Sequence, residues 1–310
     1  MRTVGIDLAS QDDRTAACVI DWQADAGLVT RLVPTRVSDT DIVDLALAAD
    51  KVGVDVPFGW PIAFAEAVAR HSIDAYWPVE YLHADNKAMC YRATDLRVKD
   101  LVNLNPLSVS SDRIALPAMR TAALMSRLEG RGPLDGTGRF VEVYPAAALH
   151  RWGLTWKGYK DQKPENRVRR EVLVRSLLDT ARTWLRVESG EVAALIDDDN
   201  ALDAFVAALI ARAAAVGLVE PVPDADRVAA SREGWIAIPL AGSLSGLTGR
   251  GSLSAALWGG RFDASGGRLV GVIPGDRFGR VTARSRRPTP GPPGLARRRG
   301  RWVRGALPGR

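Results

Sequence analysis

The order of strand-like and helix-like segments in the first 56 residues limits most strongly what this chain can fold into. Three apolar runs, at 4–8, 15–22 and 27–34, are joined by short polar connections typical of hairpins. Ser38 then begins a capping-box pattern that predicts a helix, and residues 52–56 read as a fourth strand. Three antiparallel strands, a helix and a further strand parallel to the first predict a mixed α/β sheet.

The later segments extend this pattern. Residues from about 61 to 135 are rich in helical and loop signals, which predicts a helical insert. A fifth strand is expected at 140–144, a long polar helix at about 165–187, and a last helix at about 197–216. We therefore expect an α/β domain over residues 1–240.

The C-terminal segment, residues 241–310, differs in composition from the rest of the chain. It holds 14 arginines, no lysine and two acids, which gives a net charge of +12. The whole chain has a net charge of +6, so the other 240 residues have a net charge of −6. Sixteen of the 29 glycines also lie here. This Gly/Arg/Pro-rich composition predicts a largely flexible tail, which either attracts polyanions by charge or has no selected role.

The number of cysteines and the distribution of apolar residues limit the cellular compartments in which the protein is expected. Two cysteines 72 positions apart form neither a disulfide framework nor a metal-ligand pattern, which suits a reducing compartment. No apolar run reaches the roughly 18 residues of a membrane span, and the N-terminus lacks the layout of a signal peptide. We therefore expect a cytoplasmic protein with no membrane partner; the oligomeric state stays open.

Carboxylates interrupt otherwise apolar elements at Asp7, Asp55, Glu142 and Asp203. Asp199 lies four residues before Asp203 and shares its helix face. Unpaired acids in such places are costly, and a hard divalent cation compensates them. Each position is also open to a structural interpretation: turn formation for Asp7 and Asp55, pairing with an arginine of the insert for Glu142, and helix capping for Asp199.

Seven short motifs resemble, in order, the family called domain of unknown function 429, which is described as predicted nucleases with an RNase H-like fold. The resemblance covers residues 1 to about 239. The motifs are Gly5-Ile-Asp-Leu-Ala-Ser10, Gly53-Val-Asp-Val-Pro-Phe-Gly59, Tyr91-Arg-Ala-Thr-Asp95, Glu142-Val-Tyr-Pro145, Gly158-Tyr-Lys160, Asp199-Asn-Ala-Leu-Asp-Ala204 and Glu233-Gly-Trp-Ile236.

The resemblance implies a five-stranded, RuvC-like mixed sheet whose acids bind Mg²⁺ or Mn²⁺. By this carry-over the metal ligands are Asp7, Asp55, Asp199 and Asp203, and the catalytic set is Asp7, Asp55, Glu142 and Asp203. Arg92 and Lys160 are candidates to bind a substrate phosphate, with an Arg92–Asp95 pair as the alternative. The chain departs from the family pattern at Asn200. Many members have an acid three residues before the last helix aspartate, which is Asp203 here, and this chain has an asparagine at that position.

Three functions follow from these residues. The leading one is a metal-dependent nuclease that cleaves DNA or RNA, with metal-activated water as the nucleophile. The second is nucleotide-dependent phosphotransfer, because the motif at residues 5–10 also resembles the first phosphate loop of the actin and sugar-kinase superfamily. The third is a non-catalytic module that binds nucleic acid.

Overall fold

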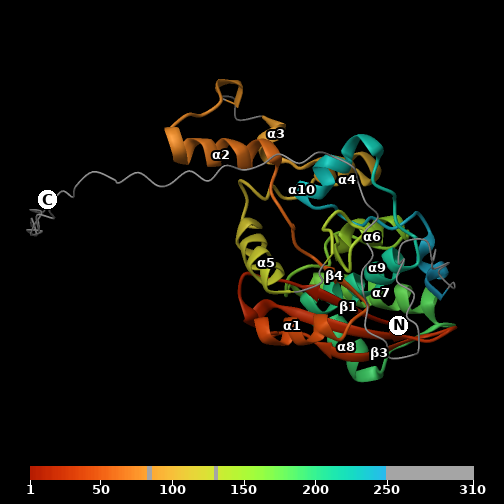
Figure 1. Cartoon of the computed structure of the whole chain (residues 1–310). Helices are drawn as coiled ribbons and strands as arrows, with labels where there is room; N and C mark the ends of the chain where they lie inside the picture. The colour runs from red at the N-terminus through yellow and green to blue at the C-terminus, as the bar shows by residue number, and fades with distance from the viewer. Residues whose placement is uncertain (82–85, 129–131, 249–310) are drawn as a thin grey trace, which may run out of the picture. The chain divides into compact units, whose positions relative to one another are not determined.

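The computed structural model describes residues 1–81, 86–128 and 132–248 (Figure 1). The strands are β1 (Arg2–Asp7), β2 (Ala16–Trp22), β3 (Gly27–Val33), β4 (Lys51–Val54), β5 (Phe140–Glu142) and β6 (Leu185–Arg186). The α-helices are α1 (Asp39–Leu47), α2 (Ile62–Asp74), α3 (Lys87–Cys90), α4 (Ala93–Val102), α5 (Ala115–Arg127), α6 (Pro145–Arg151), α7 (Pro164–Ala181), α8 (Ser189–Asp197), α9 (Asp199–Ala215) and α10 (Arg227–Glu233). Short 3₁₀ helices are η1 (Asp12–Arg14), η2 (Val79–Tyr81), η3 (Asp224–Asp226) and η4 (Ser243–Thr248).

The strands form one mixed sheet in the order β5-β4-β1-β2-β3-β6. β1 pairs antiparallel with β2 and parallel with β4, so the predicted mixed α/β sheet and the parallel fourth strand are confirmed. The expected number of five strands was wrong. The predicted helix at 165–187 ends at Ala181, and β6 then pairs in parallel with β3. A two-residue strand is too short to leave an alternating pattern in the sequence.

The two faces of the sheet are covered by different helices. On one face, Val4, Ile6 and Val54 pack against α1 and α5. On the other, Cys18 and Val141 pack against the alanine-rich helix α9 and against α6 and α7. The capping box predicted at the start of α1 is present, with reciprocal bonds between Ser38 and Asp41.

Helix α9 lies unusually close to the centre of the sheet because two strand positions facing it are glycines. A Cβ on Gly5 of β1 would come within 2.0 Å of the carbonyl oxygen of Ala204, and a Cβ on Gly53 of β4 within 2.5 Å of the carbonyl oxygen of Ala207. Real Cβ atoms do not approach so closely, so only glycine permits this packing. The chain thereby fixes the distance between α9 and the two parallel strands.

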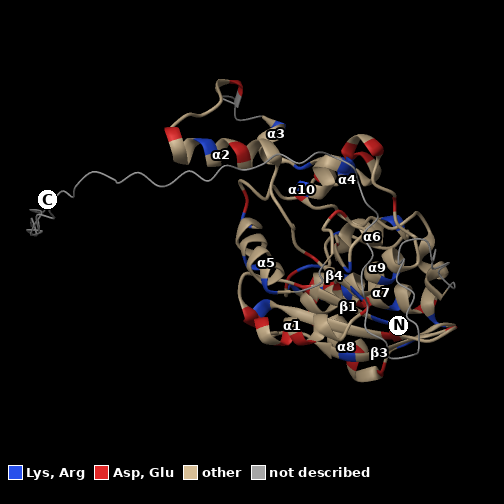
Figure 2. Ribbon diagram, in the orientation of Figure 1, with Lys and Arg blue, Asp and Glu red and all other residues tan. Residues whose placement is uncertain are grey.

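Between β4 and β5 the chain runs through helices α2 to α5 (Figure 1). Lys and Arg are interspersed with Asp and Glu along the described helices (Figure 2). None of the helices in the described ranges has the length and apolar character needed to cross a membrane.

The first domain continues past the boundary expected at residue 240. Leu244 and Leu247 of η4 are buried in the core beside α9, and the backbone carbonyl of Leu247 accepts a 2.9 Å hydrogen bond from Arg212. Contacts between residues of the chain divide it into a first unit, Met1–Ala255, and a second unit, Ala256–Arg310. The predicted flexible tail lies outside the described residues from 249 onward.

Candidate carboxylate site

Two of the predicted acids occupy the same edge of the sheet. Asp7 is the last residue of β1 and Asp55 directly follows β4. The two strands are parallel, and the Asp55 N–H donates to the carbonyl of Ile6 at 2.8 Å, so both acids lie at the carboxyl ends of neighbouring strands. Each follows its glycine, Gly5 or Gly53, by two residues, which directs both side chains toward α9.

Helix α9 contributes the third acid, Asp203. It neighbours Ala204, the residue that contacts Gly5, and only 2% of Asp203 is exposed. Burial first, and then the charges of Asp203 and Asp55, raise the pKa of Asp7, so the three carboxylates are electrostatic neighbours. The structure therefore brings Asp7, Asp55 and Asp203 together from three separate elements.

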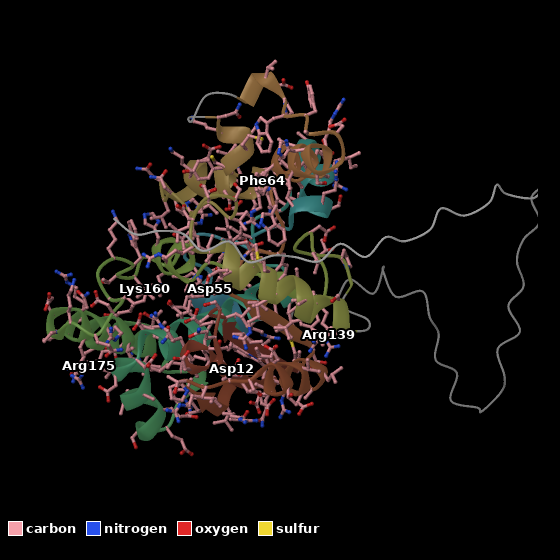
Figure 3. The ribbon with its side chains drawn as sticks, turned by 90° about the vertical axis from the view of Figure 1, so that its left-hand side faces the viewer. Asp12, Asp55, Phe64, Arg139, Lys160 and Arg175 are labelled. Carbon is pink, nitrogen blue, oxygen red and sulfur yellow. The ribbon has the colours of Figure 1, made fainter. Side chains whose placement is uncertain are left out.

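A pocket of about 470 Å³ opens beside these acids. Asp7, Asp55 and Lys160 form part of its lining, and Asp203 lies behind Tyr159 and Lys160 (Figure 3 labels Asp55 and Lys160). Much of the remaining wall is apolar or aromatic: Leu8, Val56, Pro57, Leu104, Pro106, Leu107, Ile114, Val143, Tyr144, Ala146, Trp156 and Ile236. A mostly apolar pocket with a few convergent charges is the usual form of a small-molecule site.

The ammonium of Lys160 is the cation of this cluster. Its Nζ lies 2.7 Å from Oδ2 of Asp203, and the Tyr159 hydroxyl donates to Oδ1 of the same carboxylate at 2.8 Å. Partial desolvation lowers the pKa of Lys160, whose side chain is still half exposed, but the charge of Asp203, with those of Asp55 and Asp7, raises the pKa well above its usual value. Lys160 is therefore held in its charged form.

Burial and mutual repulsion make the acids hard to ionise together. Burial first, and then the charges of Asp203 and Asp55, raise the pKa of Asp7 well above its ordinary value. Burial also raises the pKa of Asp55 to about 7, although Lys160 opposes the shift. Burial and the charge of Asp203 raise the pKa of Tyr159. When all three acids ionise, the one ammonium does not neutralise them, so a further cation would favour the ionised form of the cluster.

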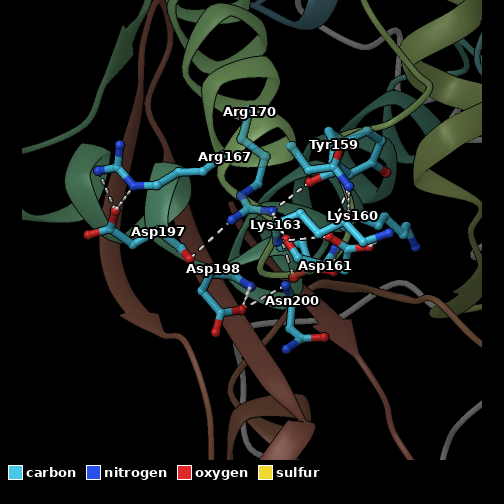
Figure 4. A network of polar contacts seen from close by, with 12 residues as sticks. Tyr159, Lys160, Asp161, Lys163, Arg167, Arg170, Asp197, Asp198 and Asn200 are labelled. Atoms are coloured by element: carbon cyan, nitrogen blue, oxygen red, sulfur yellow. Dashed lines mark hydrogen bonds and ion pairs between the residues drawn. The ribbon is translucent and has the colours of Figure 1, made fainter.

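Arg170 of α7 holds the Tyr159–Lys160 segment in place, a role that sequence analysis missed. Its guanidinium is fully buried and donates to the carbonyls of Tyr159 (2.6 Å) and Asp161 (2.5 Å) in the segment after α6. It also donates to the carbonyl of Ile196 (2.9 Å) and to that of Asp197 (3.3 Å), at the end of α8. Figure 4 shows Arg170 between Tyr159, Asp161 and Asp197. α7 is rich in arginine, so no sequence signal distinguishes this one.

Arg92 and Glu142 form a buried network beside the acids. All five N–H donors of Arg92 are engaged: with both carboxylate oxygens of Asp95, with both of Glu142 at 2.6 and 2.7 Å, and with the carbonyl of Glu233. This is the structural interpretation that the sequence left open for both residues. Arg92 has no N–H left for a substrate phosphate.

Glu142 also reaches the segment after Asp55. Its Oε2 accepts the N–H of Phe58 at 3.0 Å, in addition to the bond from Arg92. Its charge contributes to the raised pKa of Asp55. Glu142 therefore lines the pocket with both oxygens already bonded, and it fixes the backbone that carries Asp55.

Asp199 and Asn200 lie at the beginning of α9, outside the pocket lining. The helix cap is Asp198, whose carboxylate accepts the N–H groups of Asn200 and Ala201. Asp199 accepts the N–H of Asp161 at 3.2 Å, and its charge contributes to the raised pKa of Asp7. It thus supports the segment that carries Lys160 and remains within electrostatic range of the acids.

The donor set suits a hard cation, although the acids are not already arranged around one. Within residues 1–81, 86–128 and 132–248, no group of three or more His, Cys, Asp or Glu side chains has the spacing of a metal site. In the same ranges the carboxylates of Asp7 and Asp55 make no hydrogen bond or ion pair, and both open into the pocket. Free carboxylate oxygens of this kind are the ligands that Mg²⁺ and Mn²⁺ prefer.

Comparisons with known proteins identify the family of this chain but assign no activity to it. Neither the curated proteins nor the solved structures provided a match. One family model, described as "Protein of unknown function (DUF429)", matches residues 5–228, a range that contains Asp7, Asp55, Asp203 and the Lys160 segment. With well over half of its length matched, the chain belongs to the DUF429 family.

Proposed function

We propose that this protein is a metal-dependent nuclease that hydrolyses phosphodiester bonds in a nucleic acid. The observation that carries the proposal is the convergence of Asp7, Asp55 and Asp203 beside one pocket, from two parallel strands and a helix. Acids that are costly to bury together are compensated by a divalent ion that also binds phosphate oxygens.

The sheet supports an RNase H-like assignment within this proposal. Across the sheet the strands follow the order β3, β2, β1, β4 and β5. β2 runs antiparallel to β1, whereas β4 and β5 run parallel to β1. The acids lie on the first strand, after the fourth strand and on a late helix, as the family resemblance implies. β6 is an addition at the far edge, away from the carboxylates.

In the proposed reaction, Asp7, Asp55 and Asp203 hold one or two Mg²⁺ or Mn²⁺ ions, and Asp199 contributes charge from nearby. When bound, such an ion activates water and stabilises the departing oxygen of the phosphodiester. Lys160, at the pocket surface, turns from Asp203 toward a phosphate oxygen of the substrate.

Arg92 and Glu142 take positioning roles in this proposal. Their mutual bonds and the bond from Phe58 to Glu142 hold the backbone that follows Asp55. Neither residue contacts the phosphate, because their polar atoms already have partners within the protein.

The proposal is tested with the full chain and labelled DNA and RNA, each single-stranded, duplex and branched. The incubations contain Mg²⁺, Mn²⁺ or EDTA. Cleavage is expected with the ions and not with EDTA. Asp7→Asn and Asp203→Asn should each lower the rate by at least about 100-fold, the scale on which removal of one electrostatic stabiliser acts. Asp25→Asn, at the exposed turn after β2, is the matched control and should cleave normally.

The other two functions are distinguished by the same incubations repeated with labelled ATP. Transfer of the γ-phosphate from ATP, with no cleavage, would favour the phosphotransferase. Tight binding of structured nucleic acid with no reaction in either ion would favour the non-catalytic module. Full activity of Asp7→Asn would contradict the carboxylate mechanism.

A further inference from the structure

We propose that the apolar part of the pocket binds the base of a single unpaired nucleotide, next to the phosphodiester that the carboxylates process. This inference rests on the proposed function and narrows its substrate to nucleotides whose base is free to leave a stack. The base site is continuous with the carboxylate site, because one pocket is lined by both sets of residues.

The size and chemistry of the pocket favour a base with part of its sugar. Its volume of about 470 Å³ lies in the range of roughly 300–1,000 Å³ that is usual for small-molecule sites. Asp7, Asp55 and Lys160 line the pocket, together with Arg92, Asp95 and Glu142, which are paired with one another. Leu104, Ile114, Trp156 and Ile236 contribute apolar surface. A nucleotide has the same division, with an anionic phosphate and a flat base whose faces are apolar.

Two pocket residues have features that a bound base would complete. Leu107 is 59% exposed although it lines the pocket, so its apolar surface is available to a ligand. The hydroxyl of Tyr144, which also lines the pocket, makes no hydrogen bond with any part of the chain that the structure describes. A base or sugar edge supplies an apolar contact for Leu107 and a polar partner for Tyr144.

The charge of residues 1–240 also favours recognition of a single nucleotide. The whole chain carries +6 and residues 241–310 carry +12, so residues 1–240 are net −6. Affinity for long polyanions comes mainly from rows of basic residues, whereas in the described part basic and acidic residues are interspersed (Figure 2). A base inside a paired duplex is stacked and does not enter such a pocket, so an unpaired or extruded nucleotide is required.

The binding test uses adenosine 5′-monophosphate and ribose 5-phosphate as probes, which share a phosphate and differ in the base. Calorimetry with the full chain in Mg²⁺ is expected to give at least about tenfold tighter binding of the nucleotide, because a buried base contributes more than the roughly 1.4 kcal/mol that tenfold represents. Leu107→Ser should remove most of that difference. Leu116→Ser, at a 61% exposed leucine of α5 that does not line the pocket, is the matched control and should retain it.

The cleavage test separates this inference from the proposed nuclease. Single-stranded DNA and the same strand with one abasic residue are compared at the bond beside that residue. Slower cleavage at the abasic position, with a smaller difference in Leu107→Ser, supports the base site. Equal cleavage of both strands overturns the base site while the nuclease stands. Selective binding of the nucleotide without any cleavage would support the base site and reject the nuclease.

Discussion

The ammonium of Lys160 lies 2.7 Å from Oδ2 of Asp203, so an internal cation already faces the acids that we propose bind a metal. The acids Asp7 and Asp55 contribute to the raised pKa of this lysine as well. Lysine and a divalent ion therefore compete for the same negative charge.

Lys160→Met should destabilise the protein in EDTA and strengthen its response to Mn²⁺. Loss of the ammonium leaves Asp203 buried without a cation, which we expect to cost about 1–2 kcal/mol, less than for a fully enclosed pair because the lysine side chain is 54% exposed. Mn²⁺ should then raise the melting temperature more than in the unmodified protein. Lys163→Met, at the exposed Lys163–Asp161 pair, should behave normally in both respects. An unchanged response to Mn²⁺ would contradict the competition.

The stability of the metal-free protein should fall as the pH rises from about 4 to about 7. The pKa of Asp55 is about 7 in the folded protein and about 3.9 in an unfolded chain, so only the unfolded state loses its proton in this window. Above pH 7 the contribution of Asp55 levels off. Asp55→Asn should remove its part of the slope and increase stability at pH 8 by up to about 4 kcal/mol, since the shift is about three pKa units and each corresponds to about 1.4 kcal/mol. Urea unfolding in EDTA at pH 5 and pH 8 measures both effects; a steeper slope in Asp55→Asn would contradict them.

Gly5→Ala and Gly53→Ala should each destabilise the fold by about 1–3 kcal/mol or more, because the new Cβ meets the backbone of α9 and the helix must shift. The shift also moves Asp203 relative to Asp7, so any metal affinity should fall. Gly190→Ala in α8 is the control, because a Cβ there meets nothing within 4 Å. Thermal unfolding distinguishes the variants, and the idea fails when all three melt alike.

Arg92→Ala should cost about 3–5 kcal/mol, because it leaves Glu142 and Asp95 buried without their cation. Arg92→Lys keeps the charge but loses the planar fork of donors, and we expect an intermediate cost. Arg175→Ala removes an exposed pair with Glu171 and should cost about 0.3–0.5 kcal/mol. Free energies of unfolding from urea titrations rank the three; equal costs at positions 92 and 175 would exclude a structural network.

The sequence predicted the parts of the fold that repeat a pattern over several residues. Apolar runs joined by short polar connections were sufficient for β1 to β3, and the Ser38 capping box was sufficient for the start of α1. β6 has two residues and no pattern, so its pairing with β3 depends on tertiary contacts that sequence periodicity does not encode. The helix predicted at about 165–187 continued past the end of α7 and across β6, and α8 was not predicted.

The candidate site was partly predictable because buried acids interrupt apolar elements. That signal found Asp7, Asp55 and Asp203, which the structure brings together. It did not separate acids that face the pocket from Glu142, whose arginine partner lies 50 residues earlier in the chain. Arg170 was missed because its partners are backbone carbonyls, which leave no trace in residue identity.

In the metal site that we propose, the close approach of α9 at Gly5 and Gly53 would link ion preference to core packing. A larger ion such as Ca²⁺ takes ligands at about 2.3–2.6 Å and a smaller one such as Mg²⁺ at about 2.0–2.1 Å. The aspartates stand two residues beyond the glycines on the strands and one residue before Ala204 on the helix. Binding of a wider ion would therefore require substitutions in the core residues that set the position of α9, and substitution of the ligands alone would not be sufficient.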